Sequence, residues 1–183
     1  MAVGAVDMRF ASDVICGGDS VGHTIRIKQL SHDAESTPKS ASIMTTNLAI
    51  SVGVCGESTL LVGDEHTASR VGSGLIGVLA TPVMINVIEA AALACCEALL
   101  PEGHQSLGTH LNISHIAATP VGMCIVARAT VTHVEGRKIS FAIQVHDQRD
   151  LIGEGTHERV VVNVAKFDLR VQEKIRLLGD KLV

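Results

Sequence analysis

Residues 82–100 constrain the fold more than any other part of the chain. As a helix, this segment is apolar almost all the way round, with only three polar side chains, Asn86, Glu89 and Glu97. Such a helix must be enclosed by other parts of the protein or by lipid. Because two carboxylates within a membrane span would be costly, we expect a buried helix of a soluble protein and no membrane partner. Thr81-Pro82 can open this helix, and Pro101-Glu102-Gly103 can end it.

Strand-like segments on both sides of the helix can supply the enclosure. One precedes it, at residues 57–62, and four follow it, at 105–116, 122–134, 137–147 and 151–164. Glu135-Gly136 makes a short turn between the second and third of these four. Runs of strands with a single central helix indicate an α+β fold. We therefore expect a curved antiparallel sheet wrapped around one helix, with a weakly amphipathic helix at 166–178.

Residues 1–47 differ from the rest and predict an extension, flexible over most of its length, ahead of one domain at 48–183. The stretch 31–42 is polar and rich in serine, and only 23–30 alternates like a strand. We expect the extension to pack little on the domain and to be unnecessary for activity. A chain that begins at Met44 should therefore keep its activity.

Composition narrows the class of partner. The net charge is −4 without an evident basic patch, and aromatic residues make up only 2% of the chain, so a nucleic-acid partner is not expected. The five cysteines, an odd number without a C-x-x-C pair, indicate reduced, buried thiols and a cytoplasmic location. Zinc-ligand spacings and phosphate-binding glycine motifs are absent from the sequence, so we expect neither a metal nor a cofactor.

Two polar residues of the helix are candidates for chemistry. Glu89 belongs either to a narrow solvent-facing stripe or to the edge of a pocket, where a carboxylate can act as a base or a nucleophile. Thr81 suits the N-cap position of the helix. The free N–H groups at that helix end can also stabilise an oxyanion, so Thr81 could take part in catalysis there. The capping role and the catalytic role of Thr81 are compatible.

Two strand segments carry the other candidates. Strand alternation puts Leu107, Thr109 and His115 on one largely apolar face, so His115 is either a core histidine or a partly buried acid–base group. His157 and Arg159 share a face of a later strand. They form edge-strand charge pairs, or Arg159 binds a carboxylate or phosphate through its fork of N–H donors.

Four strings, in order along the chain, resemble the fluoroacetyl-CoA-thioesterase-like family of hotdog thioesterases: EHTASRVGSG, ATPVMINVIEAA, SLGTHLNISHIAATPVG and IGEGTHERVVVNVAKF. The resemblance covers about residues 48–183. It implies a hotdog fold, hydrolysis of a small acyl-CoA thioester and a homodimer with active sites at the subunit interface. A non-catalytic acyl-CoA-binding or regulatory module on the same fold is the alternative, because a fold alone does not fix a function.

The resemblance also implies which residues act. Thr81, Glu89 and His115 correspond to the catalytic residues of the family. Gly108 would turn its backbone N–H toward the thioester oxygen, and Arg159 would lie close to the same region. Fluoroacetyl-specific members carry a Phe-containing lid before the threonine. The corresponding loop here, residues 71–79, is short and aliphatic. We therefore expect this segment to shape the pocket mouth, and short or medium unsubstituted acyl groups to be preferred over fluoroacetyl.

Overall fold

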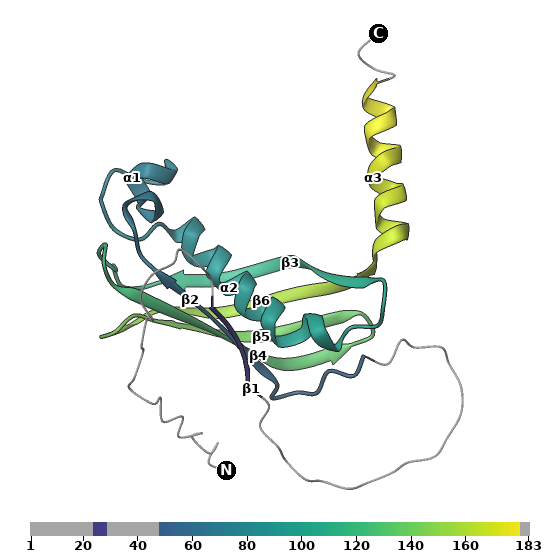
Figure 1. Ribbon diagram of the computed structural model, residues 1–183, viewed down its shortest axis with the longest axis horizontal. Helices are drawn as coiled ribbons and strands as arrows, with labels where there is room; N and C mark the ends of the chain where they lie inside the picture. Colours follow the sequence, from purple (N-terminus) through teal and green to yellow (C-terminus); the bar gives the residue numbers. More distant parts are fainter. Residues whose placement is uncertain (1–23, 29–47, 180–183) are drawn as a thin grey trace, which may run out of the picture.

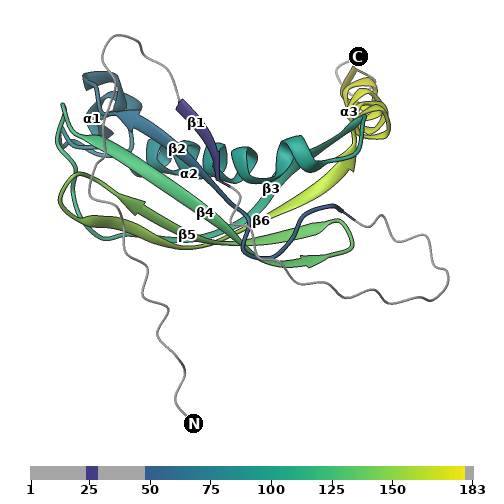
Figure 2. The same ribbon diagram turned by 60° about the horizontal axis from the view of Figure 1, so that its bottom comes forward.

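The computed structural model describes residues 24–28 and 48–179. Its six strands form one antiparallel sheet in the order β1-β2-β4-β5-β6-β3. Figures 1 and 2 show this sheet curling around the central helix α2 (Thr81–Cys96). The strands are β1 (Thr24–Lys28), β2 (Cys55–Leu61), β3 (His104–His115), β4 (Cys124–Glu135), β5 (Lys138–His146) and β6 (Leu151–Asn163). The expected α+β architecture, a hotdog fold, is confirmed.

Four helical segments complete the fold. A 3-10 turn (Asp64–His66) and the short helix α1 (Ala68–Val71) precede α2 (Thr81–Cys96), and a second 3-10 turn (Glu97–Leu99) follows it. The last helix, α3 (Val164–Gly179), rises from the end of β6 and stands away from the sheet (Figure 1).

Helix α2 forms the centre of the core. Eight of its residues are buried against the sheet: Met84, Val87, Ile88, Ala91, Ala92, Ala94, Cys95 and Cys96. The sheet approaches closely, because a Cβ on Gly56 of β2 would overlap the Ala91 carbonyl. By length and composition alone the segment Thr81–Leu99 could cross a membrane. Its burial inside the sheet is what a core helix of this hydrophobicity requires.

The ends of α2 differ from the sequence-based expectation. Its N-cap is Ala80, which has extended backbone, and Thr81 is the first helical residue. The predicted N-cap role of Thr81 is therefore wrong. At the other end regular helix stops at Cys96, and the final turn is 3-10 rather than α-helical.

Strand β1 is a second difference. Residues 24–28 pair with β2, with Ile25 opposite Ser58, and form one edge of the sheet. The expectation that the extension packs little on the domain is wrong for these five residues, whose alternation is a genuine strand signal. The remainder of residues 1–47, including Met44, lies outside the described residues, so its flexibility remains a prediction.

A bulge in β3 breaks the strand alternation. Gly108 pairs with Arg159 and His110 with Glu158, which leaves Thr109 as the extra residue. Its hydroxyl donates to the Glu158 carbonyl at 3.2 Å. A bulge of this kind reverses the faces of the residues on either side of it. Leu107 and Thr109 are exposed and do not share a face with His115, contrary to the prediction.

The cysteines follow the prediction in part. Cys55, Cys95 and Cys96 are buried and are not part of a disulfide, and burial raises the pKa of the Cys95 thiol to about 12. A thiol with so high a pKa is a poor nucleophile at neutral pH. Cys124 is disulfide-bonded, so the expectation of reduced thiols is wrong at that position.

Candidate active site

Thr81 and His115 form a direct pair at one end of the central helix. The Thr81 hydroxyl lies 2.9 Å from Nδ1 of His115, the last residue of β3. Because Ala80 is the N-cap, the Thr81 side chain does not cap the helix and is available to the imidazole. Two of the three predicted catalytic residues are thus brought together.

His115 is half-buried, and only one of its two ring nitrogens has a hydrogen-bond partner among the described residues. Its Nε2 is buried and makes no hydrogen bond within the described part of the chain. Burial lowers the pKa of His115 below its ordinary value, and the backbone at Ala117 opposes that shift to a smaller degree. The ring is therefore neutral at pH 7. An unpartnered buried nitrogen is unusual for a purely structural histidine and favours the acid–base alternative.

A pocket of about 370 Å³ opens beside this pair. Thr81 and His115 line it together with the segment before α2 and the residues after β3: Ala68, Ser73, Gly74, Leu75, Ile76, Val78, Leu79, Ile116, Ala117 and Ala118. Leu75 is 97% exposed, and Gly72 has a left-handed φ of 78° that only glycine adopts easily. Aliphatic residues within 71–79 therefore do border the pocket, as the sequence predicts.

Glu89 lies in a second polar group, farther along α2. Its Oε1 is 3.8 Å from Nη1 of Arg159, and its side chain is 38% exposed. The carboxylate packs directly on Gly108 of β3, where a Cβ would overlap Oε1. Glu89 is partly exposed, and it meets both Gly108 and Arg159, two other predicted site residues.

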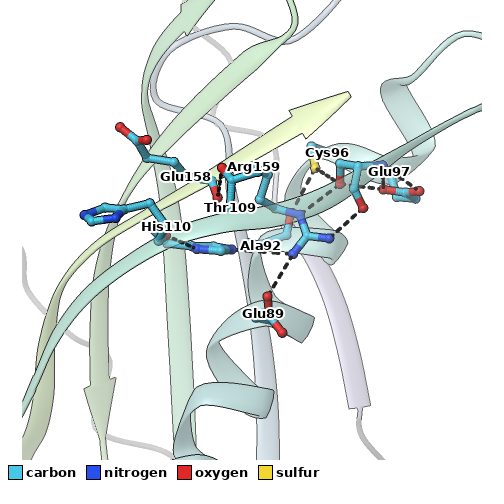
Figure 3. A network of polar contacts seen from close by, with 10 residues as sticks. Glu89, Ala92, Cys96, Glu97, Thr109, His110, Glu158 and Arg159 are labelled. Carbon is cyan, nitrogen blue, oxygen red and sulfur yellow. Dashed lines mark hydrogen bonds and ion pairs between the residues drawn. The ribbon is translucent and has the colours of Figure 1, made fainter. Parts of the chain in front are cut away.

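Ser106 of strand β3 fixes the Arg159 side chain through two hydrogen bonds. Its Nε donates to Ser106 Oγ at 2.9 Å and its Nη2 to the Ser106 carbonyl at 2.8 Å, while Ser106 Oγ donates to Glu97 at 2.9 Å. Figure 3 shows this chain of contacts leading from Glu97 through Arg159 to Glu89. Arg159 is buried on β6, which lies inside the sheet between β5 and β3, so the edge-strand alternative is wrong.

His157 completes this group from the same face of β6. Its Nδ1 donates to the His110 carbonyl at 2.9 Å, so Nε2 carries the lone pair and faces Nη1 of Arg159 at 3.4 Å. Burial lowers the pKa of His157, which keeps the ring neutral beside the guanidinium. Sequence reasoning missed His157, Ser106 and Glu97 as site residues. The shared face of His157 and Arg159 was the one available signal.

The two groups are separate within one chain. Thr81 and Glu89 are eight residues apart on α2, a rise of about 12 Å along the helix. Within the described residues, no hydrogen bond or ion pair joins Glu89 to Thr81 or His115. The residues predicted for the site therefore form two separate polar groups within one chain.

Comparison with known proteins places the chain in a family. Residues 62–165 match the family of fluoroacetyl-CoA-specific thioesterases. The fluoroacetyl-CoA thioesterase of Streptantibioticus cattleyicolor is 40% identical over 97 residues, which are 53% of this chain and 70% of that protein. A solved structure of the fluoroacetyl-CoA thioesterase FlK has 32% identity and a TM-score of 0.66, covering 69% of this chain and 98% of FlK. A thioesterase superfamily member from Thermus thermophilus has 26% identity and a TM-score of 0.63, covering 73% and 96%.

Fold and comparisons together define a hotdog thioesterase. The chain belongs to the fluoroacetyl-CoA-specific thioesterase family, and it is an enzyme of the acyl-CoA thioesterase class. The roles of Thr81, Glu89, His115, Gly108 and Arg159 stay predictions.

Proposed function

We propose that this protein hydrolyses small acyl-CoA thioesters to the free acid and CoA, at a site completed by two subunits. The observation that carries the proposal is the Thr81–His115 pair beside the pocket, with Nε2 of His115 buried and unpartnered within the described residues. Solved structures of FlK include complexes with acetyl-CoA and with fluoroacetate and CoA, which supports this substrate class.

The free edge of β3 supports a homodimer. β3 is the terminal strand of the described sheet, and its twelve residues have an unpaired edge. Long open edges favour pairing with another strand, and a two-fold axis makes β3 pair antiparallel with its own copy. The α2 helices of the two subunits then lie side by side. Glu89 and Gly108 of one subunit face the Thr81–His115 pair of the other.

Each residue type suits one part of thioester hydrolysis. The Glu89 carboxylate attacks the carbonyl carbon or activates the water that does so. The Gly108 N–H stabilises the oxyanion. Neutral His115, oriented by Thr81, accepts a proton from the attacking water and passes it to the thiolate released as the C–S bond breaks. Arg159 fixes the Glu89 carboxylate, and Ser106 fixes Arg159. The products are the acid and free CoA.

The aliphatic pocket wall supports short or medium acyl groups. Leu75, Ile76 and Val78 offer apolar contact, worth about 0.8 kcal/mol per buried CH₂. Residues 71–79 contain no phenylalanine, so we expect little preference for fluoroacetyl-CoA over acetyl-CoA. A chain that begins at Met44 lacks β1. We expect it to keep its activity, and its thermal midpoint measures what β1 contributes to stability.

Hydrolysis of acetyl-, butyryl- and fluoroacetyl-CoA, followed by thiol release, tests the proposal. The wild-type protein should turn over at least one of them, and Glu89→Gln should lower kcat/KM by at least about 10²-fold with the dimer intact. Acyl-CoA binding without turnover would instead indicate the non-catalytic binding module. A strong fluoroacetyl preference would contradict the selectivity of the aliphatic wall.

A further inference from the structure

A second pocket lies at the opposite end of β3 from His115. It has a volume of about 230 Å³ and is formed where β3 begins, β6 ends and α3 starts. Four of its lining side chains are basic or can become so: His104, Arg137, Lys166 and Arg170. Among the described residues that line it, none is acidic.

The cations of this pocket stand without carboxylate partners. Within residues 24–28 and 48–179, neither Arg137, Lys166 nor Arg170 forms an ion pair, whereas Arg128 and Lys138 each pair with a glutamate. The net charge of the chain is −4, so the three unpaired cations around this pocket are a local concentration of positive charge. They leave a positive potential that an anion can neutralise.

Two further features of α3 fit a phosphorylated nucleotide. The Asn163 side chain accepts the Lys166 N–H at 3.1 Å, so the positive end of this 16-residue helix lies at the pocket. Phe167 also lines the pocket and is 38% exposed. An exposed aromatic ring among cations can stack on a purine while the cations contact its phosphates.

We propose that this pocket binds the phosphorylated adenosine of CoA. Arg137, Lys166 and Arg170 contact the phosphates, and Phe167 stacks on the adenine. The inference rests on the proposed acyl-CoA hydrolysis, and it adds a recognition site for the part of the substrate that does not react.

The pocket serves the active site of the partner subunit. Within one chain, His104 and His115 stand at opposite ends of β3, about 36 Å apart at the rise of an extended strand. The pantetheine arm of CoA cannot span that distance. Antiparallel pairing of β3 with its copy brings the start of one strand beside the end of the other. The nucleotide pocket of one subunit then adjoins the Thr81–His115 pocket of the partner.

Comparing acyl-CoA with the matching acyl-pantetheine, which lacks the nucleotide, tests the proposal on the full chain. Arg137→Ala, Lys166→Ala and Arg170→Ala should each raise KM for acyl-CoA about 2–5-fold, and the triple variant by about tenfold or more. KM for acyl-pantetheine and kcat for both substrates should not change. Lys174→Ala, on the same helix but outside the pocket lining, is the matched control and should behave as wild type.

Two other results would overturn the inference. The first is an unchanged KM for acyl-CoA in the folded triple variant. The second is an equal rise in KM for both substrates, because this shows a general structural effect. Absence of hydrolysis of either substrate by the wild-type protein is a different outcome, since it refutes the proposed function itself.

Direct binding gives a readout that needs no turnover. Adenosine 3′,5′-bisphosphate should bind wild-type protein in calorimetry and compete with acyl-CoA. Its affinity should fall with added salt, because screened charges dominate, and Phe167→Leu should weaken it about tenfold. Equal affinity of wild type and the triple variant for this nucleotide would contradict the assignment.

Discussion

Replacing Gly108 with alanine should separate catalysis from folding. Gly108 does not have a left-handed φ, so alanine fits its backbone without strain. The new Cβ would overlap Oε1 of Glu89 and would come within 3.1 Å of Cε1 of His157. The Glu89 carboxylate is the free end of a flexible, partly exposed side chain, so it moves away more easily than the backbone does.

The expected cost in stability is small. The displaced ion pair between Glu89 and Arg159 is long and partly exposed, a kind worth at most about 1 kcal/mol. Alanine also restricts the unfolded chain, which returns about 0.4–1 kcal/mol. The free energy of unfolding should therefore change by less than about 1 kcal/mol. Activity should change far more, because a carboxylate misplaced from the reacting atoms loses about 10²-fold or more in kcat/KM.

Urea denaturation and steady-state hydrolysis of the best acyl-CoA measure the two effects. Gly63→Ala is the matched control: its Cβ would come within 2.5 Å of the Glu65 carboxylate, which lies outside the candidate site. That variant should keep both stability and activity. Near-wild-type kcat/KM in Gly108→Ala would refute the role given to the Glu89 position.

Three further substitutions address other parts of the site. Thr81→Val should lower kcat/KM about tenfold or more and leave the thermal midpoint within error, whereas the loss expected for a removed N-cap, about 1 kcal/mol, would contradict the assignment of Ala80 as the cap. Ser106→Ala leaves buried Arg159 short of an acceptor, and in urea titration it should cost about 1–3 kcal/mol. The lowered pKa of His157 means that the unfolded state binds more protons just below pH 6.5. Its contribution to stability is therefore present above pH 6.5 and is lost as the pH falls. His157→Gln should flatten this loss between pH 7 and 5, and an unchanged pH profile of unfolding would contradict it.

The regular elements of this fold are readable from the sequence because each has a strong period. The apolar helix and the four later strands lie within a few residues of their predicted bounds. Strand β1 was visible as alternation in residues 23–30, but alternation cannot reveal the neighbour that pairs with it. The pairing of β1 with β2 depends on the tertiary structure, which a local sequence pattern does not show.

The residues proposed for the site could be named from the sequence, but the contacts among them could not. The bulge at Thr109 depends on backbone pairing with Glu158, and no spacing rule signals it. Because of this bulge, Gly108 faces Glu89 and His115 faces Thr81, although both residues belong to the same strand. The Ser106–Arg159 contacts join residues 53 positions apart, so only the folded sheet shows them.

Mixed dimers test the central claim, a site shared between subunits, most directly. In a heterodimer of Glu89→Gln with His115→Ala, one shared site collects both defects and the other has none. If Glu89 acts on the partner's His115, the heterodimer should have about half the wild-type kcat per dimer. An equimolar mixture whose subunits reassort at random is about half heterodimer, so it should recover about a quarter of the wild-type kcat per dimer. If both residues act within one subunit, every site carries a defect. The mixture would then stay as inactive as its components, and the shared site would be refuted.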